Sequence, residues 1–149
     1  MRTVERFVTP VPAGVVWRIL ADVEHWPSWT PTVLAVQPLT AAGLRVGARY
    51  RVTQPKLRPA IYEVTECTPN EAFTWVQRFP GGTIIADHRL APRDGGTEVE
   101  LSVTSNGLVA NLVSMMFSKL IREYVATEAR SLKRQCELPA KVSANEFSP

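Results

Sequence analysis

The chain of 149 residues is 45% hydrophobic and 21% charged, which predicts one globular domain large enough to bury a core. It has no apolar run approaching the roughly 20 residues of a membrane-spanning helix, and its N-terminus lacks the pattern of a secretory signal peptide. Its net charge of +3 is too small to indicate nucleic-acid binding. We therefore expect a cytoplasmic protein with no integral membrane segment and no nucleic-acid partner.

The first elements are a strand expected over Thr3–Thr9 and a corner, Pro10–Pro31, that predicts two short helices. Pro12 suits the first turn of a helix, where its missing amide is not needed, and later prolines prevent one continuous helix. Trp26 and Trp29 are three residues apart and therefore share a face. We interpret both tryptophans as core side chains that close one end of the interior.

Six further strands follow the corner, each bounded by turn residues. Turns rich in glycine, at 80–82 and 94–96, join the last three strands into antiparallel hairpins. With the first strand they predict a seven-stranded antiparallel sheet. The six strands are expected over Val33–Pro38, Ala48–Gln54, Ala60–Thr68, Ala72–Phe79, Thr83–Pro92 and Thr97–Ser105.

Alternation in the last strand indicates which side chains face inward. Val99 and Leu101 alternate with Glu98 and Glu100, so the two apolar side chains share one face. If Val99 pairs near Leu90, cross-strand partners share that face, and the inward positions of the two preceding strands follow. A register slip of one residue would invert this face. The predicted inner face contains Tyr50, Tyr62, Phe73, Trp75, Gln77, Phe79, Ile84, Ala86, His88, Leu90, Val99, Leu101 and Val103.

The segment from Leu108 to about Cys136 has helical periodicity and predicts one long helix, roughly 43 Å at 1.5 Å per residue. We expect residues 1–138 to form a single domain and the polar segment 139–149 to be a disordered tail. The apolar stripe expected to face the sheet contains Val109, Val113, Met116, Phe117, Leu120, Ile121 and Tyr124.

These elements predict the α+β class, with a curved sheet wrapped on a long C-terminal helix. A strongly bent sheet pulls away from a straight helix along part of its length, so we expect an internal cavity. His88 is the inward side chain best suited to proton transfer near neutral pH. A single histidine on an apolar face is more often a hydrogen-bonded wall residue, and both interpretations stay open.

Other chemical signatures are weak. The serines lack a G-x-S-x-G motif, the two histidines lack metal-ligand spacing, and Cys67 and Cys136 form no C-x-x-C motif. We therefore expect no metal and no cofactor. Basic residues gather without an intervening acid, which we interpret as a solvated outer face, with an anionic ligand or partner as the alternative; they are Arg45, Arg49, Arg51, Lys56 and Arg58.

Four features together resemble the START-like superfamily, also described as the polyketide cyclase/dehydrase and lipid transport family, over roughly Thr3 to Leu138. They are the helix opening with Val16 and Trp17, the corner DVEHWPSWTP from Asp22, the hairpin HRLAPRDGGTEV from His88, and the helix after Gly107. The resemblance implies the helix-grip fold and an apolar pocket between sheet and helix. Because this fold hosts carriers, binders and cyclases, it does not by itself name a ligand.

We therefore expect the protein to bind or transport a small hydrophobic or amphipathic ligand, such as a lipid, an isoprenoid quinone or a polyketide-like molecule. One alternative is a cyclase or dehydratase with His88 as acid or base; another is a ligand-free interaction module. The oligomeric state stays open between monomer and homodimer. The expected ligand contacts are Trp29, Tyr50, Tyr62, Trp75, Gln77, Ala86, His88, Leu101, Val113, Met116, Phe117 and Leu120.

Overall fold

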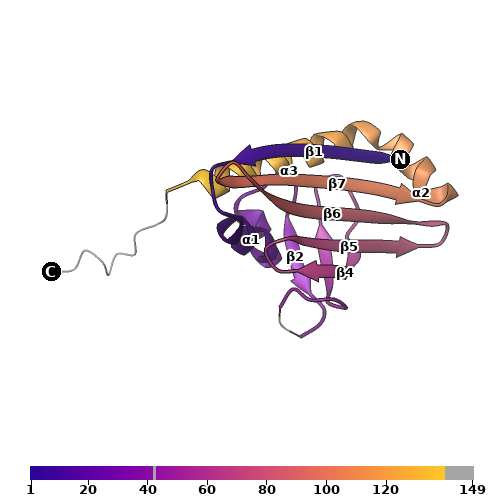
Figure 1. Cartoon of the computed structure of the whole chain (residues 1–149). Coiled ribbons are helices and arrows are strands. Elements are labelled where there is room, and N and C mark those ends of the chain that lie inside the picture. Colours follow the sequence, from indigo (N-terminus) through magenta and orange to yellow (C-terminus); the bar gives the residue numbers. More distant parts are fainter. Residues whose placement is uncertain (42, 140–149) are drawn as a thin grey trace.

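The computed structural model describes residues 1–41 and 43–139, so the predicted tail lies outside the described residues except for Pro139. Seven antiparallel strands form one curved sheet in the order β1-β7-β6-β5-β4-β3-β2 (Figure 1). The strands are β1 Arg2–Thr9, β2 Ala35–Pro38, β3 Arg49–Thr53, β4 Ala60–Thr68, β5 Ala72–Phe79, β6 Gly82–Arg93 and β7 Gly96–Asn106. The predicted fold class is confirmed.

The register confirms the predicted inner face of the hairpins. Leu90 pairs with Val99, and His88 pairs with Leu101 on β7 and with Phe73 on β5. Arg89 lies on the opposite face, where its guanidinium contacts the Glu66 carboxylate at 3.1 Å. His88 therefore stands in the middle of the inner face, with a paired strand on each side.

The corner forms helix α1 (Ala13–Ala21) and the short 3-10 helix η1 (Val23–Ser28). Leu20 is fully buried, and the indole N–H of Trp26 donates a hydrogen bond to the Leu20 carbonyl oxygen at 2.9 Å. Asp22 makes no capping bond to the backbone; its carboxylate contacts His25 Nδ1 at 2.8 Å instead. The bond from Trp26 ties η1 to α1 and holds the indole over the inner face.

The predicted single C-terminal helix is wrong in one respect, because it breaks at Phe117 into α2 (Leu108–Met116) and α3 (Ser118–Glu137). Phe117 itself leaves helical geometry, with φ −105° and ψ 18°. α2 packs on the ends of β6 and β7, whereas α3 runs along β1 and β7 (Figure 1). One straight helix cannot follow both directions, and the break occurs without a proline or glycine.

Of the two C-terminal helices, α3 is the one whose buried side chains reach the inner face of the sheet. Its buried side chains Val125, Ala129, Leu132 and Cys136 join the core formed by the inner face and the corner helices. In the described part of the chain, no helix combines the length and apolar character needed to cross a membrane.

Candidate functional site

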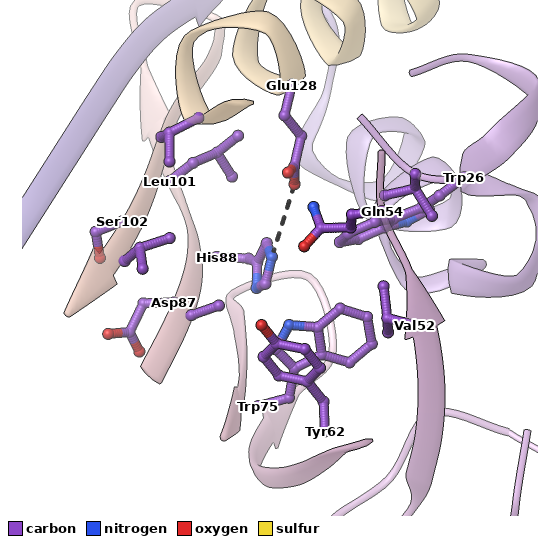
Figure 2. Close-up of a pocket in the computed structure, with 14 residues that line it drawn as sticks. Trp26, Val52, Gln54, Tyr62, Trp75, Asp87, His88, Leu101, Ser102 and Glu128 are labelled. Carbon is purple, nitrogen blue, oxygen red and sulfur yellow. Dashed lines mark ion pairs between the residues drawn. The ribbon is translucent and has the colours of Figure 1, made fainter. Parts of the chain in front are cut away.

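A cavity of about 70 Å³ lies between the inner face of the sheet and α3 (Figure 2). Strands, corner and helix all contribute to its wall. Side chains of Asp87 and Ser102 point away from His88 in Figure 2, so these two residues border the cavity from the far side of their strands. The lining residues are Trp26, Val33, Val52, Gln54, Tyr62, Trp75, Ala86, Asp87, His88, Leu101, Ser102, Val103, Val125 and Glu128.

Aromatic rings form one wall of this cavity around Trp75. The Trp75 ring centroid lies 5.3 Å from the centroids of both Trp26 and Tyr62, and it meets Phe73 edge-on at 5.4 Å. Contacts of this geometry add to the energy of apolar burial. The wall is therefore apolar and closely packed, and polar chemistry must come from the few other side chains.

His88 is held in place on two sides. Its ring stacks on Phe73 with centroids 4.0 Å apart, and its Nδ1 lies 3.1 Å from the Phe73 carbonyl oxygen. Because a carbonyl only accepts, this bond places the proton on Nδ1 and leaves the Nε2 lone pair free. Burial lowers the pKa of His88 to about 4, although the bond to Phe73 acts in the opposite direction. The imidazole is therefore neutral near neutral pH, with Nε2 as an acceptor.

Glu128 of α3 faces His88 across the cavity. Its Oε1 lies 3.9 Å from His88 Nε2, and the side chain is only 16% exposed (Figure 2). Burial raises the pKa of Glu128 to about 7. Among the described residues, no hydrogen-bond donor is placed on this carboxyl group. A buried carboxyl with no donor is costly to ionise, which is the physical cause of the shift.

The contact between these two groups becomes an ion pair only when His88 is protonated and Glu128 is not. Both pKa shifts oppose that state. A separation of 3.9 Å also exceeds hydrogen-bond distance. The carboxyl and the imidazole are therefore available to a third atom placed between them.

Two further polar side chains lie beside this pair. The Gln54 amide nitrogen donates to the Thr32 carbonyl oxygen at 3.1 Å, which leaves the Gln54 amide oxygen as an acceptor toward the pocket (Figure 2). Burial raises the pKa of Tyr62 to about 12, and the nearby Glu128 carboxylate acts in the same direction. Tyr62 therefore stays a neutral phenol throughout the physiological range.

The structure brings five of the predicted ligand contacts together at this cavity. Tyr62, Trp75, Ala86, His88 and Leu101 all line it. Trp29 and Tyr50 are buried in the core but lie outside the cavity lining. Gln77 shares the inner face but also lies outside the lining. Their roles as ligand contacts stay predictions.

The predicted contacts from the C-terminal helix lie elsewhere. Val113, Met116 and Phe117 are all more than one-third exposed, and neither they nor the half-buried Leu120 line the cavity. The expectation that the stripe of α2 faces the sheet is wrong, because α2 turns its small residues Ala110 and Ser114 inward instead.

Sequence reasoning missed Glu128 and Gln54. Glu128 could have been found, because it follows Val125 by three residues and precedes Leu132 by four, so it interrupts an apolar helical stripe. A carboxylate in such a stripe predicts a buried ionisable group. Gln54 follows the last residue of β3; at the end of the predicted strand Ala48–Gln54 it shares the parity of the inward Tyr50, and this signal could have found it.

Comparisons place this geometry among known proteins. The sequence model of a family described as polyketide cyclase / dehydrase and lipid transport matches residues 1–137. A search of curated proteins found no match. Among solved structures, Ara h 8.0201 has a TM-score of 0.69 and 14% identity, over 91% of this chain and 97% of its own.

Two bacterial structures are similar to the same extent. TTHA0849 from Thermus thermophilus has a TM-score of 0.72 and 17% identity, over 91% of this chain and 97% of its own. The hypothetical protein jhp0584 from Helicobacter pylori has a TM-score of 0.78 and 11% identity, over 92% of this chain and 88% of its own. At these identities the likeness establishes the fold alone.

Proposed function

The chain belongs to the polyketide cyclase/dehydrase and lipid transport family, and from this premise we propose that its cavity binds a small, largely apolar ligand. The single observation that supports this proposal is the buried Glu128 carboxyl, which faces a cavity and has no donor among the described residues. Pockets for small molecules are commonly apolar with a few placed polar groups. This cavity has that composition.

The polar groups favour a ligand that carries a hydrogen-bond donor. His88 Nε2, the Gln54 amide oxygen and the ionised Glu128 carboxylate are all acceptors. A hydroxylated lipid or a phenolic, polyketide-like molecule supplies a donor to this group. A quinone supplies only carbonyl acceptors, for which the site offers the Tyr62 hydroxyl and, when it is protonated, the Glu128 carboxyl as donors.

Ligand size follows from the cavity. Ligand pockets usually measure roughly 300–1,000 Å³, so the volume of about 70 Å³ in this conformation admits a small molecule or one end of a longer one. A longer apolar ligand requires side chains of the wall to move. Each buried methylene contributes about 0.8 kcal/mol, which favours such an opening.

We propose that the protein binds its ligand in the cytoplasm. Cys67 and Cys136 are both free thiols, as is usual in a reducing compartment.

The proposal predicts that wild-type protein binds a naphthol more tightly than its methyl ether at about pH 8, where Glu128 is ionised. We expect a ratio of about tenfold or more, because hydrogen bonds to charged groups contribute about 1.5–3 kcal/mol. Fluorescence titration measures both affinities. Equal affinities would contradict the donor preference.

A cavity-filling variant locates the binding. Ala86→Leu places three extra carbon atoms in the cavity and should abolish naphthol binding. Ala91→Leu makes the same change on the same strand at an exposed position, and it should bind as the wild type does. Binding that persists in Ala86→Leu would place the ligand elsewhere.

Glu128 and His88 favour a second candidate function, which is acid–base catalysis of a dehydration or cyclisation. Glu128, with a pKa of about 7, can donate a proton, while neutral His88 can accept one, and both face one cavity. Turnover of a poly-ketone substrate should then show a bell-shaped pH profile. His88→Gln should abolish turnover and retain binding; an unchanged rate in that variant would exclude this candidate.

A further inference from the structure

α2 presents an apolar face to solvent. Leu108, Leu112, Met115 and Met116 are 87%, 57%, 66% and 72% exposed. Their spacing of four, three and one residues places them on one side of the helix. Amphipathic helices of globular proteins usually turn such a face inward, so this orientation is the reverse of the usual one.

Close backbone contacts hold α2 in this orientation. Gly82 allows the approach, because a Cβ atom there would lie 2.4 Å from the Cβ of Ala110. The Val109 amide donates to the Gly81 carbonyl oxygen at 3.1 Å, and the Ser105 hydroxyl donates to the Asn111 amide oxygen at 2.7 Å. The small side of α2 is therefore fixed on the β5–β6 turn and the end of β7, and the apolar side is fixed outward.

The charged residues nearest to this face in the sequence are cations. Lys119 and Arg122 are exposed in the first turns of α3, directly after the apolar residues. The segment from Leu101 to Arg122 contains no acidic residue, and the nearest acid that follows is the exposed Glu123. The tip of the β5–β6 hairpin, residues 79–86, contains no charged residue at all. α2 lies at one end of the sheet (Figure 1). An apolar helix face that is followed by two exposed cations suits an anionic lipid surface.

We propose that the outward face of α2, formed by Leu108, Leu112, Met115 and Met116, docks on anionic lipid bilayers. The apolar side chains enter the boundary between headgroups and acyl chains, and Lys119 and Arg122 contact the anionic headgroups. This peripheral contact goes beyond ligand binding in the cavity and does not depend on it. A docked α2 would bring one end of the protein to a membrane that can supply or accept an apolar ligand.

Vesicle flotation tests the proposal. Wild-type protein should float with phosphatidylcholine vesicles that contain phosphatidylglycerol and should bind pure phosphatidylcholine much more weakly. Leu112→Gln should reduce the affinity at least about tenfold, as expected when a leucine side chain is no longer buried. Leu34→Gln is the matched control, because Leu34 is 59% exposed but lies before β2 at the far edge of the sheet.

Charge variants separate the electrostatic contribution. Replacing Lys119 and Arg122 with glutamine should lower affinity about fivefold for each charge, since a basic residue near an anionic surface contributes about 1 kcal/mol. The same change at Arg49 and Arg51, two exposed cations on β3, should have little effect. Equal losses in the two double variants would contradict a docking face at α2.

Position is tested with a fluorescent reporter. Leu112→Trp should be quenched by brominated lipids, and Leu34→Trp should not. The proposal is overturned if wild-type protein does not float with anionic vesicles. It is also overturned if the wild-type protein is a dimer that Leu112→Gln dissociates, because the face would then bind a second copy of the chain. Ala86→Leu should dock normally, so a failure of ligand binding and a failure of docking are distinguishable.

Discussion

Replacing Glu128 with glutamine should stabilise the protein above neutral pH and have little effect in mild acid. The carboxyl is buried opposite His88 and has a pKa of about 7, against 4.5 for an ordinary glutamate. The folded state therefore holds this proton more tightly than the unfolded state does. Stability from this group is complete below about pH 4.5 and is lost as the pH rises to about 7.

The expected size of this effect follows from the same shift. One pKa unit corresponds to about 1.4 kcal/mol, so a rise from 4.5 to about 7 costs the folded protein about 3 kcal/mol once Glu128 is ionised. Glutamine has nearly the same shape and never ionises. Tyr62 also faces this carboxyl, but with a pKa of about 12 it does not titrate in this range.

Urea unfolding at about pH 5 and about pH 8 measures the difference. The free energy of unfolding of Glu128→Gln should exceed that of the wild type by up to about 3 kcal/mol at the higher pH and by much less at the lower one. His88 changes the free energy of unfolding of both proteins in the opposite direction. Because its pKa is lowered in the folded state, stability is lost as the pH falls from 6.5 toward 4. An equal difference at both pH values would show that Glu128 does not titrate as described.

The second large effect is expected for Trp75→Ala. Trp75 is 3% exposed and lies against Trp26, Tyr62 and Phe73. Truncating a buried tryptophan to alanine typically costs about 3–5 kcal/mol. The same change enlarges the cavity, so the variant should bind longer apolar ligands relative to short ones.

Thermal unfolding and competition with acyl chains of graded length measure the two consequences. Trp17→Ala is the control, because Trp17 packs edge-on against Phe73 but does not line the cavity. It should destabilise the protein and leave the preferred chain length unchanged. If Trp75→Ala does not fold, Trp75→Leu provides a milder enlargement. Identical length preferences in the Trp75 variants and wild type would contradict a ligand against this wall.

Glu128 makes the folded protein less stable at neutral pH than a neutral side chain would. Natural proteins commonly retain such costs at functional sites, where activity requires a strained or unpaired group. In this chain the cost occurs at the cavity, opposite the one buried histidine among the described residues. This coincidence favours a functional carboxyl over a structural one.

The sheet could be predicted from sequence because its signals are local. Glycine turns fix the hairpins, and alternation of Val99 and Leu101 with glutamates fixes the face, so the pairing of Leu90 with Val99 followed directly. The corner was predicted for the same reason, from its prolines.

The helical half could be predicted only in part. Apolar periodicity shows that a helix has an apolar side but does not show which side meets the sheet. In α2 close contact of Ala110 with Gly82 decides the orientation, and this contact joins residues far apart in sequence. The site shows the same limit, since His88 and Glu128 lie on different elements and meet only in the folded chain.

Native mass spectrometry of the protein purified from cells that naturally produce it tests the central claim most directly. Wild-type protein should carry a co-purifying apolar ligand with a hydroxyl or phenol group, and the added mass should be absent from Ala86→Leu and present in Ala91→Leu. A wild-type protein that is free of ligand and gains no mass with naphthol or acyl alcohols would contradict the claim that this cavity is a binding site.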